Sequence, residues 1–466
     1  MDAPSLPPDV LAARPPAVLA LIQWQATQIE RLNARLAELE AQVGKDSTNS
    51  SKPPSTEHPH AKTIRPKPKS KRSHGGQPGH AKHERTLVPV EDCTTVITCA
   101  PKACRRCGNA LTGVDLQPIR HQVWELPEIP PIIVEYHQHR LICDCGCSTG
   151  GVLPLGVPTG QAGPRLIAFS GLLMACFRQS KRRAALFLST ILKQPARPAW
   201  MVSLQNRAAE AVRPAYDELA AALPAEKALY LDESPNKEGP NKSWVWTFVA
   251  ATFTVFACRL SRAAEVPKQL LGAFAGVIHC DRARMYWAFD KLPYCWAHLK
   301  RDSQGLIDSP CTVAQRLGHD LMRPTNEMFA LWQKVRDGTL SRSEFQEQMQ
   351  SIREHVESVL LRGYCNHRVH GFCTDRWEHR VRLWVFVDGE GVEPTNNAAE
   401  RSLRHAVIWR KLSFGTQSAS GSRFVERMLS VIETCRQQKR DVFAWMVDAV
   451  QAHLADQPAP SLLRKA

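Results

Sequence analysis

The chain has 466 residues, enough for about three domains of ordinary size. Hydrophobic residues make up 43% and charged residues 23%, so collagen-like, purely coiled-coil and wholly disordered chains are excluded. The net charge of +15 favours a polyanionic partner, with nucleic acid first. The longest nearly unbroken apolar run, residues 166–177, is too short for the roughly 20 residues that cross a bilayer, so we expect no membrane partner. The N-terminus lacks a secretory pattern, so the 15 cysteines are expected to be reduced thiols, which in clusters more often bind metal than form disulfides.

Residues 1–44 contain a heptad pattern. Between residues 18 and 43 apolar side chains recur at steps of four and three, with one interruption at Gln25. This spacing predicts an amphipathic helix that needs a partner surface. Either a second copy of the chain supplies it, giving a coiled-coil homo-oligomer, or the helix packs on its own domain.

Residues 45–85 have a different composition. They are rich in Gly, Pro, Ser, Lys and His, and they hold ten Lys or Arg against three acids. Such a segment cannot bury a core, so it is either a flexible basic arm that orders on phosphates or a solvated linker.

Two cysteine motifs flank alternating apolar runs in residues 86–150, which predicts a small β-rich module. A CxxCG knuckle is followed after two candidate strands by a CDCGC motif, and paired cysteines on two turns are typical of a structural Zn²⁺ site. Four of five thiols would be the ligands, or all are simple buried thiols: Cys104, Cys107, Cys143, Cys145 and Cys147. A tighter group at 365–373, with Cys365, His367, His370 and Cys373, is a weaker candidate for a second metal site.

The remaining chain alternates between helical and strand patterns. Residues 164–223 read as helices that connect to or bind DNA, and 226–290 as an α/β domain. Strands are expected at 228–231, 243–250, 253–260 and 277–280, with a helix at 266–274. Residues 291–392 are mainly helical, 393–454 are helical at both ends, and 455–466 form a tail.

Three carboxylates are candidates for chemistry. Asp232 and Asp281 each follow an apolar strand, a position where α/β sheets commonly carry active groups, although aspartate after a strand is also a common turn residue. On the strand period Asp232 shares a face with Tyr230, and Glu233 points away. Glu400 alone reads equally well as part of a helix start, with Asn397 as N-cap and Arg404 as its partner one turn later.

Four motifs in one order carry a resemblance to a known family. They are NSSKPPS at 49–55, GGQPGH at 75–80, CWAHLKRD at 295–302 and PTNNAAER at 394–401. Together they resemble the insertion-sequence transposases of the IS66 type, over nearly the whole chain. The resemblance implies a multidomain protein with an N-terminal coiled-coil helix, a zinc-binding module, and an α/β ribonuclease-H-like catalytic core of the DDE class with a helical insertion.

The resemblance also implies roles for residues. The three family acids match Asp232, Asp281 and Glu400 as catalytic residues holding two Mg²⁺ (or Mn²⁺) ions, which would support water attack on a phosphodiester and then strand transfer. It implies binding to insertion-sequence ends and target DNA, a bacterial cytoplasmic location with the nucleoid, and possible accessory proteins. Basic residues beside the acids are candidates to grip the DNA backbone: Lys300, Arg301, Arg401, Arg404, Arg410 and Lys411.

Several alternatives stay open. Trp296 and His298 either stack on an unpaired base or belong to a helical core. The whole chain is either a DNA-cutting and joining enzyme, a non-catalytic DNA-binding protein derived from a transposase, or a nuclease without a joining step. The acid trio distinguishes catalysis from binding, because three convergent carboxylates without metal would repel DNA.

Overall fold

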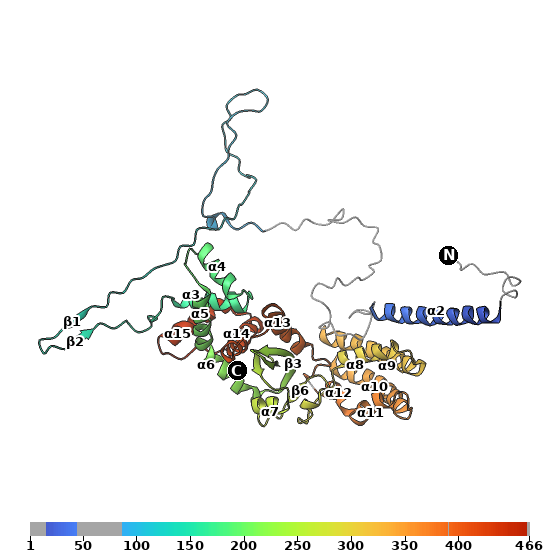
Figure 1. Cartoon of the computed structure of the whole chain (residues 1–466). Coiled ribbons are helices and arrows are strands. Elements are labelled where there is room, and N and C mark those ends of the chain that lie inside the picture. The colour runs from blue at the N-terminus through green and yellow to red at the C-terminus, as the bar shows by residue number, and fades with distance from the viewer. Residues whose placement is uncertain (1–14, 44–85, 390, 464–466) are drawn as a thin grey trace.

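The computed structural model describes residues 15–43, 86–389 and 391–463. The predicted basic arm at 45–85 therefore lies outside the described residues. Figure 1 shows a compact body of sheet and helices from which α2 and the segment before α3 project.

The elements are α2 (Pro16–Val43), η2 (Val90–Asp92), β1 (Arg140–Ile142), β2 (Ser148–Gly150), α3 (Pro164–Ala175), α4 (Lys181–Thr190), α5 (Pro198–Ala211), α6 (Arg213–Ala222), η3 (Leu223–Ala225), β3 (Ala228–Glu238), β4 (Asn241–Val249), β5 (Thr254–Arg259), α7 (Glu265–Leu271), β6 (Val277–His279), η4 (Arg284–Tyr286), α8 (Trp296–Ile307), α9 (Thr312–Arg336), α10 (Arg342–Tyr364), α11 (His370–Glu378), α12 (Val381–Asp388), α13 (Asn397–Ser413), α14 (Ala419–Gln438) and α15 (Val442–Leu454).

A four-stranded mixed sheet forms the centre of the body. Its order is β5-β4-β3-β6, with β3, β4 and β5 antiparallel and β6 parallel to β3. The helix α7 connects β5 to β6, as the sequence predicted. All four expected strands are present, but β3 runs on to Glu238, because it stays paired with β4 as far as the turn at Asn241.

Helix α14 covers the outer edge of β5. Side chains spaced four residues apart on α14 accept hydrogen bonds from alternate backbone N–H groups of the strand. Glu426 accepts from Cys258 at 2.8 Å, and Ser430 accepts from Phe256 at 2.8 Å. Thr434 accepts from Thr254 at 3.1 Å. The helix thereby satisfies backbone groups that an edge strand leaves unpaired.

Helices α8–α12 form the expected helical insertion, which has a hydrophobic core of its own. Trp296, Phe345, Trp384 and Phe386 are among its buried aromatic residues. The insertion is joined to the sheet at its base, where the backbone of Tyr294 bridges to Cys280 just after β6. It therefore connects directly to the segment that carries Asp281.

The segment from 86 to 150 differs from the predicted β-rich module. Its regular structure consists of the short hairpin β1–β2, one isolated bridge between Ala103 and Ala110, and the single turn η2. The alternating runs are extended but have no ladder partner among the described residues, and Ile119 and Ile132 are almost fully exposed. The alternation of apolar residues was not enough to predict a sheet here, because a segment of about 65 residues buries little surface and forms a stable core less readily without a metal or a disulfide.

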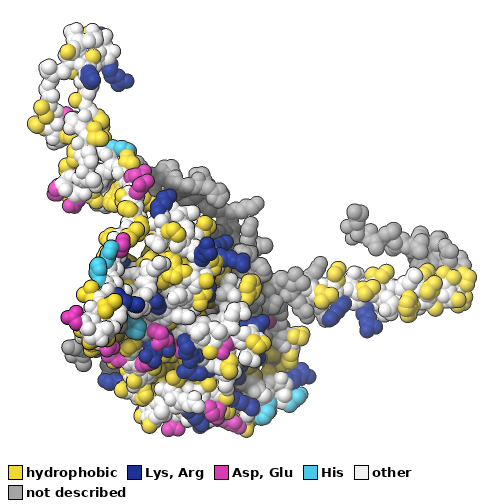
Figure 2. Space-filling view, turned by 60° about the vertical axis from the view of Figure 1, so that its left-hand side comes forward, with side chains coloured by type: hydrophobic (Ala, Val, Ile, Leu, Met, Phe, Trp, Pro, Cys, Tyr) yellow, Lys and Arg dark blue, Asp and Glu magenta, His cyan; other side chains and the backbone are white. Residues whose placement is uncertain are grey.

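Helix α2 confirms the helical part of the heptad prediction. Its seam is uncovered, since Ile29, Leu32 and Leu36 are all more than half exposed. Figure 2 shows yellow hydrophobic side chains along both projections from the body. The coiled coil itself remains a prediction. None of the helices in the described part of the chain combines the length and apolar character needed to span a bilayer.

Candidate active site

Asp232 and Asp281 come to the same edge of the sheet on neighbouring parallel strands. Tyr230 of β3 is the register partner of His279 of β6, and their rings stack with centroids 4.2 Å apart. Each aspartate follows its ring by two residues in the strand direction. The alternation of buried and half-buried residues along β3 puts Asp232 on the face of Tyr230 and buries Glu233 on the other, as the strand period predicted.

Backbone amides hold one oxygen of each aspartate. Oδ1 of Asp232 accepts from the N–H of Glu233 at 2.9 Å, and Oδ1 of Asp281 accepts from the N–H of Ala283 at 2.9 Å. Among the described residues neither Oδ2 atom has a hydrogen-bond partner. Each side chain is thus fixed in orientation while one oxygen stays available to a ligand.

Asn396 determines where the helix that bears Glu400 begins. It is fully buried, and its side-chain nitrogen donates to the carbonyl of Leu231 at 2.6 Å. Its backbone N–H donates to Sγ of Cys295 at 3.2 Å. Helix α13 therefore starts beside the residue that precedes Asp232, and Glu400 lies on its first turn.

This start corrects the sequence-based reading of α13. The N-cap is Asn396 and not Asn397, and no side chain caps the helix, because the amide of Asn396 is used on β3. Glu400 is consequently the fourth helical residue. Its ion-pair partner is Arg301 of α8 at 3.3 Å, in place of the expected Arg404, and Nε2 of His298, also on α8, lies 3.7 Å from the same carboxylate oxygen.

The carboxylates interact electrostatically. Burial is the largest cause that raises the pKa of Asp232, and the negative charges of Glu233, Asp281 and Glu400 raise it further. Burial, followed by the charge of Arg301, lowers the pKa of His298 although carboxylates surround it, so this imidazole is neutral at pH 7. The three predicted acids are therefore close enough to influence one another, and their mutual repulsion is the kind that a cation relieves.

The donor set suits a hard divalent cation, since carboxylate oxygens are the ligands that Mg²⁺ and Mn²⁺ prefer. Within the described residues, however, no three His, Cys, Asp or Glu side chains are gathered closely enough to hold a metal ion. Glu400 is instead directed to Arg301. The chemistry of the residues fits the ions, and Glu400 must leave its ion pair to bind one.

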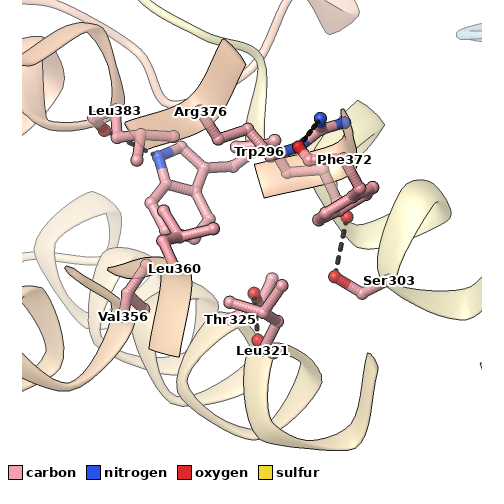
Figure 3. A pocket seen from close by; sticks show the side chains of 10 residues that line it. Trp296, Ser303, Leu321, Thr325, Val356, Leu360, Phe372, Arg376 and Leu383 are labelled. Carbon is pink, nitrogen blue, oxygen red and sulfur yellow. Dashed lines mark hydrogen bonds between the residues drawn. The ribbon is translucent and has the colours of Figure 1, made fainter. Parts of the chain in front are cut away.

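Trp296 belongs to the core of the insertion, so the base-stacking alternative is wrong for this residue. It is 2% exposed, it packs against Trp384 and Phe386, and its Nε1 donates to the carbonyl of Leu383 at 2.8 Å. Figure 3 shows its indole directed into a small cavity among the helices of the insertion, beside Leu360 and Leu383.

The basic candidates differ in their surroundings. Arg410 reaches β3, where it donates to Oγ of Ser234 at 3.1 Å and to the carbonyl of Pro235. Arg301 is committed to Glu400. The remaining candidates have exposed side chains: Lys300, Arg401, Arg404 and Lys411.

The cysteine turns are each formed but are not joined. Gly108 and Gly146 adopt positive φ, and their N–H groups close the turns onto the carbonyls of Cys104 and Cys143. Hydrogen bonds, chiefly from the backbone of Cys107 and of Cys145 respectively, lower the pKa of the Cys104 and Cys143 thiols. In Figure 1 the β1–β2 hairpin and the loop that precedes it extend in different directions.

The Cys365–Cys373 group is not assembled as a metal site. Cys373 is buried, and Nδ1 of His370 contacts the carbonyl of Tyr364 at 2.5 Å. In the described part of the chain, neither this group nor the five cysteines above bring three possible ligands together for a metal ion.

Sequence reasoning missed three residues that organise the site. Asn396 joins α13 to β3, and Arg282 and Asp302 form an ion pair beside Asp281. Asp302 and Asn396 both stand inside motifs that carry the family resemblance, so their motif positions were the available signal. Their partners are distant in sequence, and no local pattern indicates them.

Comparison with known proteins decides the family. The model described as "Transposase IS66 family" matches residues 160–423, more than half of the chain and all three candidate acids. The chain belongs to the IS66 transposase family. The resemblance predicted from four motifs is confirmed, and membership supplies the coarse activity of a transposase that acts on DNA. A second model, "Family of unknown function (DUF6444)", matches residues 6–86.

Two curated relatives of this IS66-family chain come from Sinorhizobium fredii (strain NBRC 101917 / NGR234). "Uncharacterized protein y4hP" is 23% identical over 433 residues, covering 81% of this chain and 74% of the relative. "Uncharacterized protein y4qI" is 22% identical over 240 residues, covering 46% of this chain and 44% of the relative. Neither printed name assigns an activity.

Proposed function

We propose that this IS66-family transposase cuts the ends of an insertion sequence and joins them to target DNA by DDE chemistry. Asp232, Asp281 and Glu400 would be the catalytic acids of a ribonuclease-H-like core. The observation that carries the proposal is the convergence of Asp232, Asp281 and the start of α13 at one sheet edge, although Asp281 and Glu400 are separated by a whole helical insertion. The antiparallel β3–β5 followed by a parallel β6 supports the same core.

Asp232, Asp281 and Glu400 would together hold two divalent ions, Mg²⁺ or Mn²⁺. When bound, such ions activate the attacking oxygen, support the leaving oxygen and neutralise charge on phosphorus. The protein contributes orientation: backbone amides fix Asp232 and Asp281, and Asn396 fixes the start of the Glu400 helix. Water would attack phosphorus and displace the 3′ oxygen, which leaves as a 3′ hydroxyl. This hydroxyl would then attack a target phosphodiester in line, forming a new P–O bond and displacing the 3′ oxygen of the target strand.

Arg301 has a defined part in this cycle. It holds Glu400 by an ion pair in the structure, together with His298. Since a carboxylate that binds a cation gives up part of its interaction with an arginine, release of Arg301 would free a guanidinium for the DNA backbone. Arg401, Arg404, Lys300 and Lys411, with their exposed side chains, and Arg410 beside β3 are proposed as further phosphate contacts.

We extend the proposal to the projecting parts. The lowered thiol pKa at Cys104 and Cys143 supports a Zn²⁺ site built from these turns, with the remaining ligands drawn from Cys107, Cys145 and Cys147. The exposed seam of α2 supports homo-oligomer formation through a coiled coil. No step of the reaction depends on either feature.

The test is a cleavage assay on a supercoiled plasmid that carries the two ends of the element. Asp232→Asn, Asp281→Asn and Glu400→Gln should each lower the rate of first-strand cleavage in Mg²⁺ by at least about 10³-fold, while DNA affinity measured in Ca²⁺ stays within a few-fold of wild type. Asp290→Asn, at an exposed aspartate in the same segment as Asp281, is the matched control and should cut normally.

Three results would contradict the proposal. Wild-type cleavage by any of the three variants would remove that acid from the site. DNA binding by the wild type without cleavage under Mg²⁺ or Mn²⁺ would favour the non-catalytic DNA-binding alternative, and cleavage without joined products would favour a nuclease.

A further inference from the structure

Arg282 follows Asp281 and has an incompletely used guanidinium. Its Nη2 donates to Oδ2 of Asp302, whereas its Nη1 is buried and has no hydrogen-bond partner among the described residues. A buried N–H group without a partner carries a free-energy cost, which is larger when the group is charged. This cost requires an explanation at a position next to a candidate catalytic acid.

Asp302, which lies on α8 of the insertion, also binds a second arginine, from α11. The same oxygen, Oδ2, accepts from Nη2 of Arg376 at 2.8 Å. Arg376 is 8% exposed, its Nη1 donates to the carbonyl of Phe372 at 2.6 Å, and its guanidinium lies 3.6 Å from the centroid of the Phe372 ring. Figure 3 shows Arg376 packed against Phe372 at the rim of the insertion cavity.

The pair of arginines leaves an excess of positive charge. Two guanidinium groups share the single carboxylate of Asp302, so the trio has a net charge of +1. Arg282 directly follows Asp281, and Asp302 directly follows Arg301, whose guanidinium pairs with Glu400 at 3.3 Å, so the trio lies beside the proposed catalytic acids. A cationic N–H donor without a partner therefore lies beside the place where the proposed reaction requires a phosphate.

We propose that Arg282 binds the phosphate that undergoes transfer, with Nη1 donating to a non-bridging oxygen, and that Asp302 and Arg376 are positioning residues for its guanidinium. The inference rests on the proposed function. Arginine suits this task because its planar fork lets one nitrogen be fixed while another binds phosphate. No bond to Arg282 forms or breaks and it transfers no proton; it stabilises negative charge that develops on the phosphoryl oxygens.

The first experiment measures single-turnover cleavage of the plasmid ends by the full chain in Mg²⁺. Arg282→Ala should lower the cleavage rate about 100-fold, as loss of one charge-stabilising donor commonly does, with DNA affinity changed less than tenfold. Asp302→Asn should cost less, about tenfold, because Arg282 is retained but less well oriented. Arg284→Ala, at an exposed arginine two residues away, is the matched control and should stay within twofold of wild type.

A modified substrate separates phosphate binding from a structural role. A methylphosphonate at the scissile position replaces one charged non-bridging oxygen by a methyl group. Wild type should cleave one methylphosphonate diastereomer more slowly than ordinary DNA. Arg282→Ala should cleave that diastereomer and ordinary DNA at similar rates, because its contact with the oxygen is already absent. Arg282→Lys provides the same comparison if the alanine variant fails to fold.

The outcomes distinguish this inference from the proposed function. The role of Arg282 would be overturned if the substitution and the methylphosphonate each lowered the cleavage rate by its own factor, with the two factors multiplying on both diastereomers. Cleavage by Arg282→Ala at the wild-type rate would overturn it as well. Absence of cleavage by the wild type would instead refute the proposed function, and the assignment of Arg282 with it.

Discussion

The sheet around β3 and the cysteine segment at 86–150 have comparable patterns of apolar residues but different outcomes. Every side chain of residues 245–249 in β4 and 254–258 in β5 is buried, and α14 satisfies the backbone of the outer strand. In the cysteine segment the apolar side chains are exposed and the strands are three residues long. Alternation therefore predicts a strand only where other elements supply a surface to bury it.

The largest effect concerns the proposed zinc. Removing Zn²⁺ from the full chain with a strong chelator should raise the rate of proteolytic cutting within 86–150 at least tenfold and leave the body of the molecule intact, because binding a structural zinc is coupled to local folding. The joint change Cys104→Ser and Cys143→Ser should act in the same way, as seen by limited proteolysis. Cys99→Ser, at an exposed cysteine outside both turns, is the control. Purified protein without bound zinc would contradict the prediction.

Truncation of one apolar side chain in each region sharpens the comparison. Phe248→Ala, in the fully buried part of β4, should lower the free energy of unfolding by about 3–5 kcal/mol. Ile132→Ala, where the side chain is 94% exposed, should change it by less than about 0.5 kcal/mol. Denaturant titration measures both. A similar loss for Ile132→Ala would mean that the segment has a packed core in solution.

Glu433 tests how α13 is held on the body. Burial favours a raised pKa for this carboxyl, but hydrogen bonds from Arg436 and Ser402 outweigh it and the pKa is lowered from its ordinary 4.5. A lowered folded-state pKa stabilises the fold above pH 4.5, and this contribution is lost as pH falls through the folded value. Glu433→Gln should thus lower the free energy of unfolding by about 1–3 kcal/mol at pH 7 and by progressively less below pH 4.5.

Glu426 supplies the contrast in pH profile. Burial raises its pKa, so folding favours the protonated carboxyl, and this contribution to stability is lost as pH rises through the folded value. The stability difference between wild type and Glu426→Gln should therefore change with pH in the opposite direction to that of Glu433→Gln. Parallel profiles in thermal melts would show that the environments of the two carboxylates have been misjudged.

The smallest effect is at the C-terminal end of α13. Phe414 has φ +58° and is 80% exposed, so it adopts a left-handed conformation without compensating burial. Phe414→Gly should raise the free energy of unfolding by about 0.5–1 kcal/mol, because glycine is favoured at a left-handed helix end. Leu412→Gly, within the helix, should lower it by about 1 kcal/mol. A loss on Phe414→Gly would indicate that the ring has a packing partner.

The strands and the helix that bear the candidate acids could be predicted from the sequence, but the hydrogen bonds and ion pairs that join them could not. Short apolar runs predicted the strands before Asp232 and Asp281, and motif order identified the helix of Glu400. Asn397 was the expected N-cap by local rules, whereas the actual one, Asn396, is bonded to a strand 165 residues earlier. The partners of Asp302 are likewise set by how the insertion folds back, which no local pattern encodes.

The packing of α14 over β5 has a consequence for how the chain folds during translation. Thr254 and Thr434 are 180 residues apart, with the whole insertion between them. At ordinary rates of translation, the ribosome takes on the order of ten to thirty seconds to span that distance. During this interval the nascent strand presents bare amide groups to neighbouring chains. A messenger that ends within the insertion should therefore yield an aggregating product, and chaperone demand should peak before the last helices emerge.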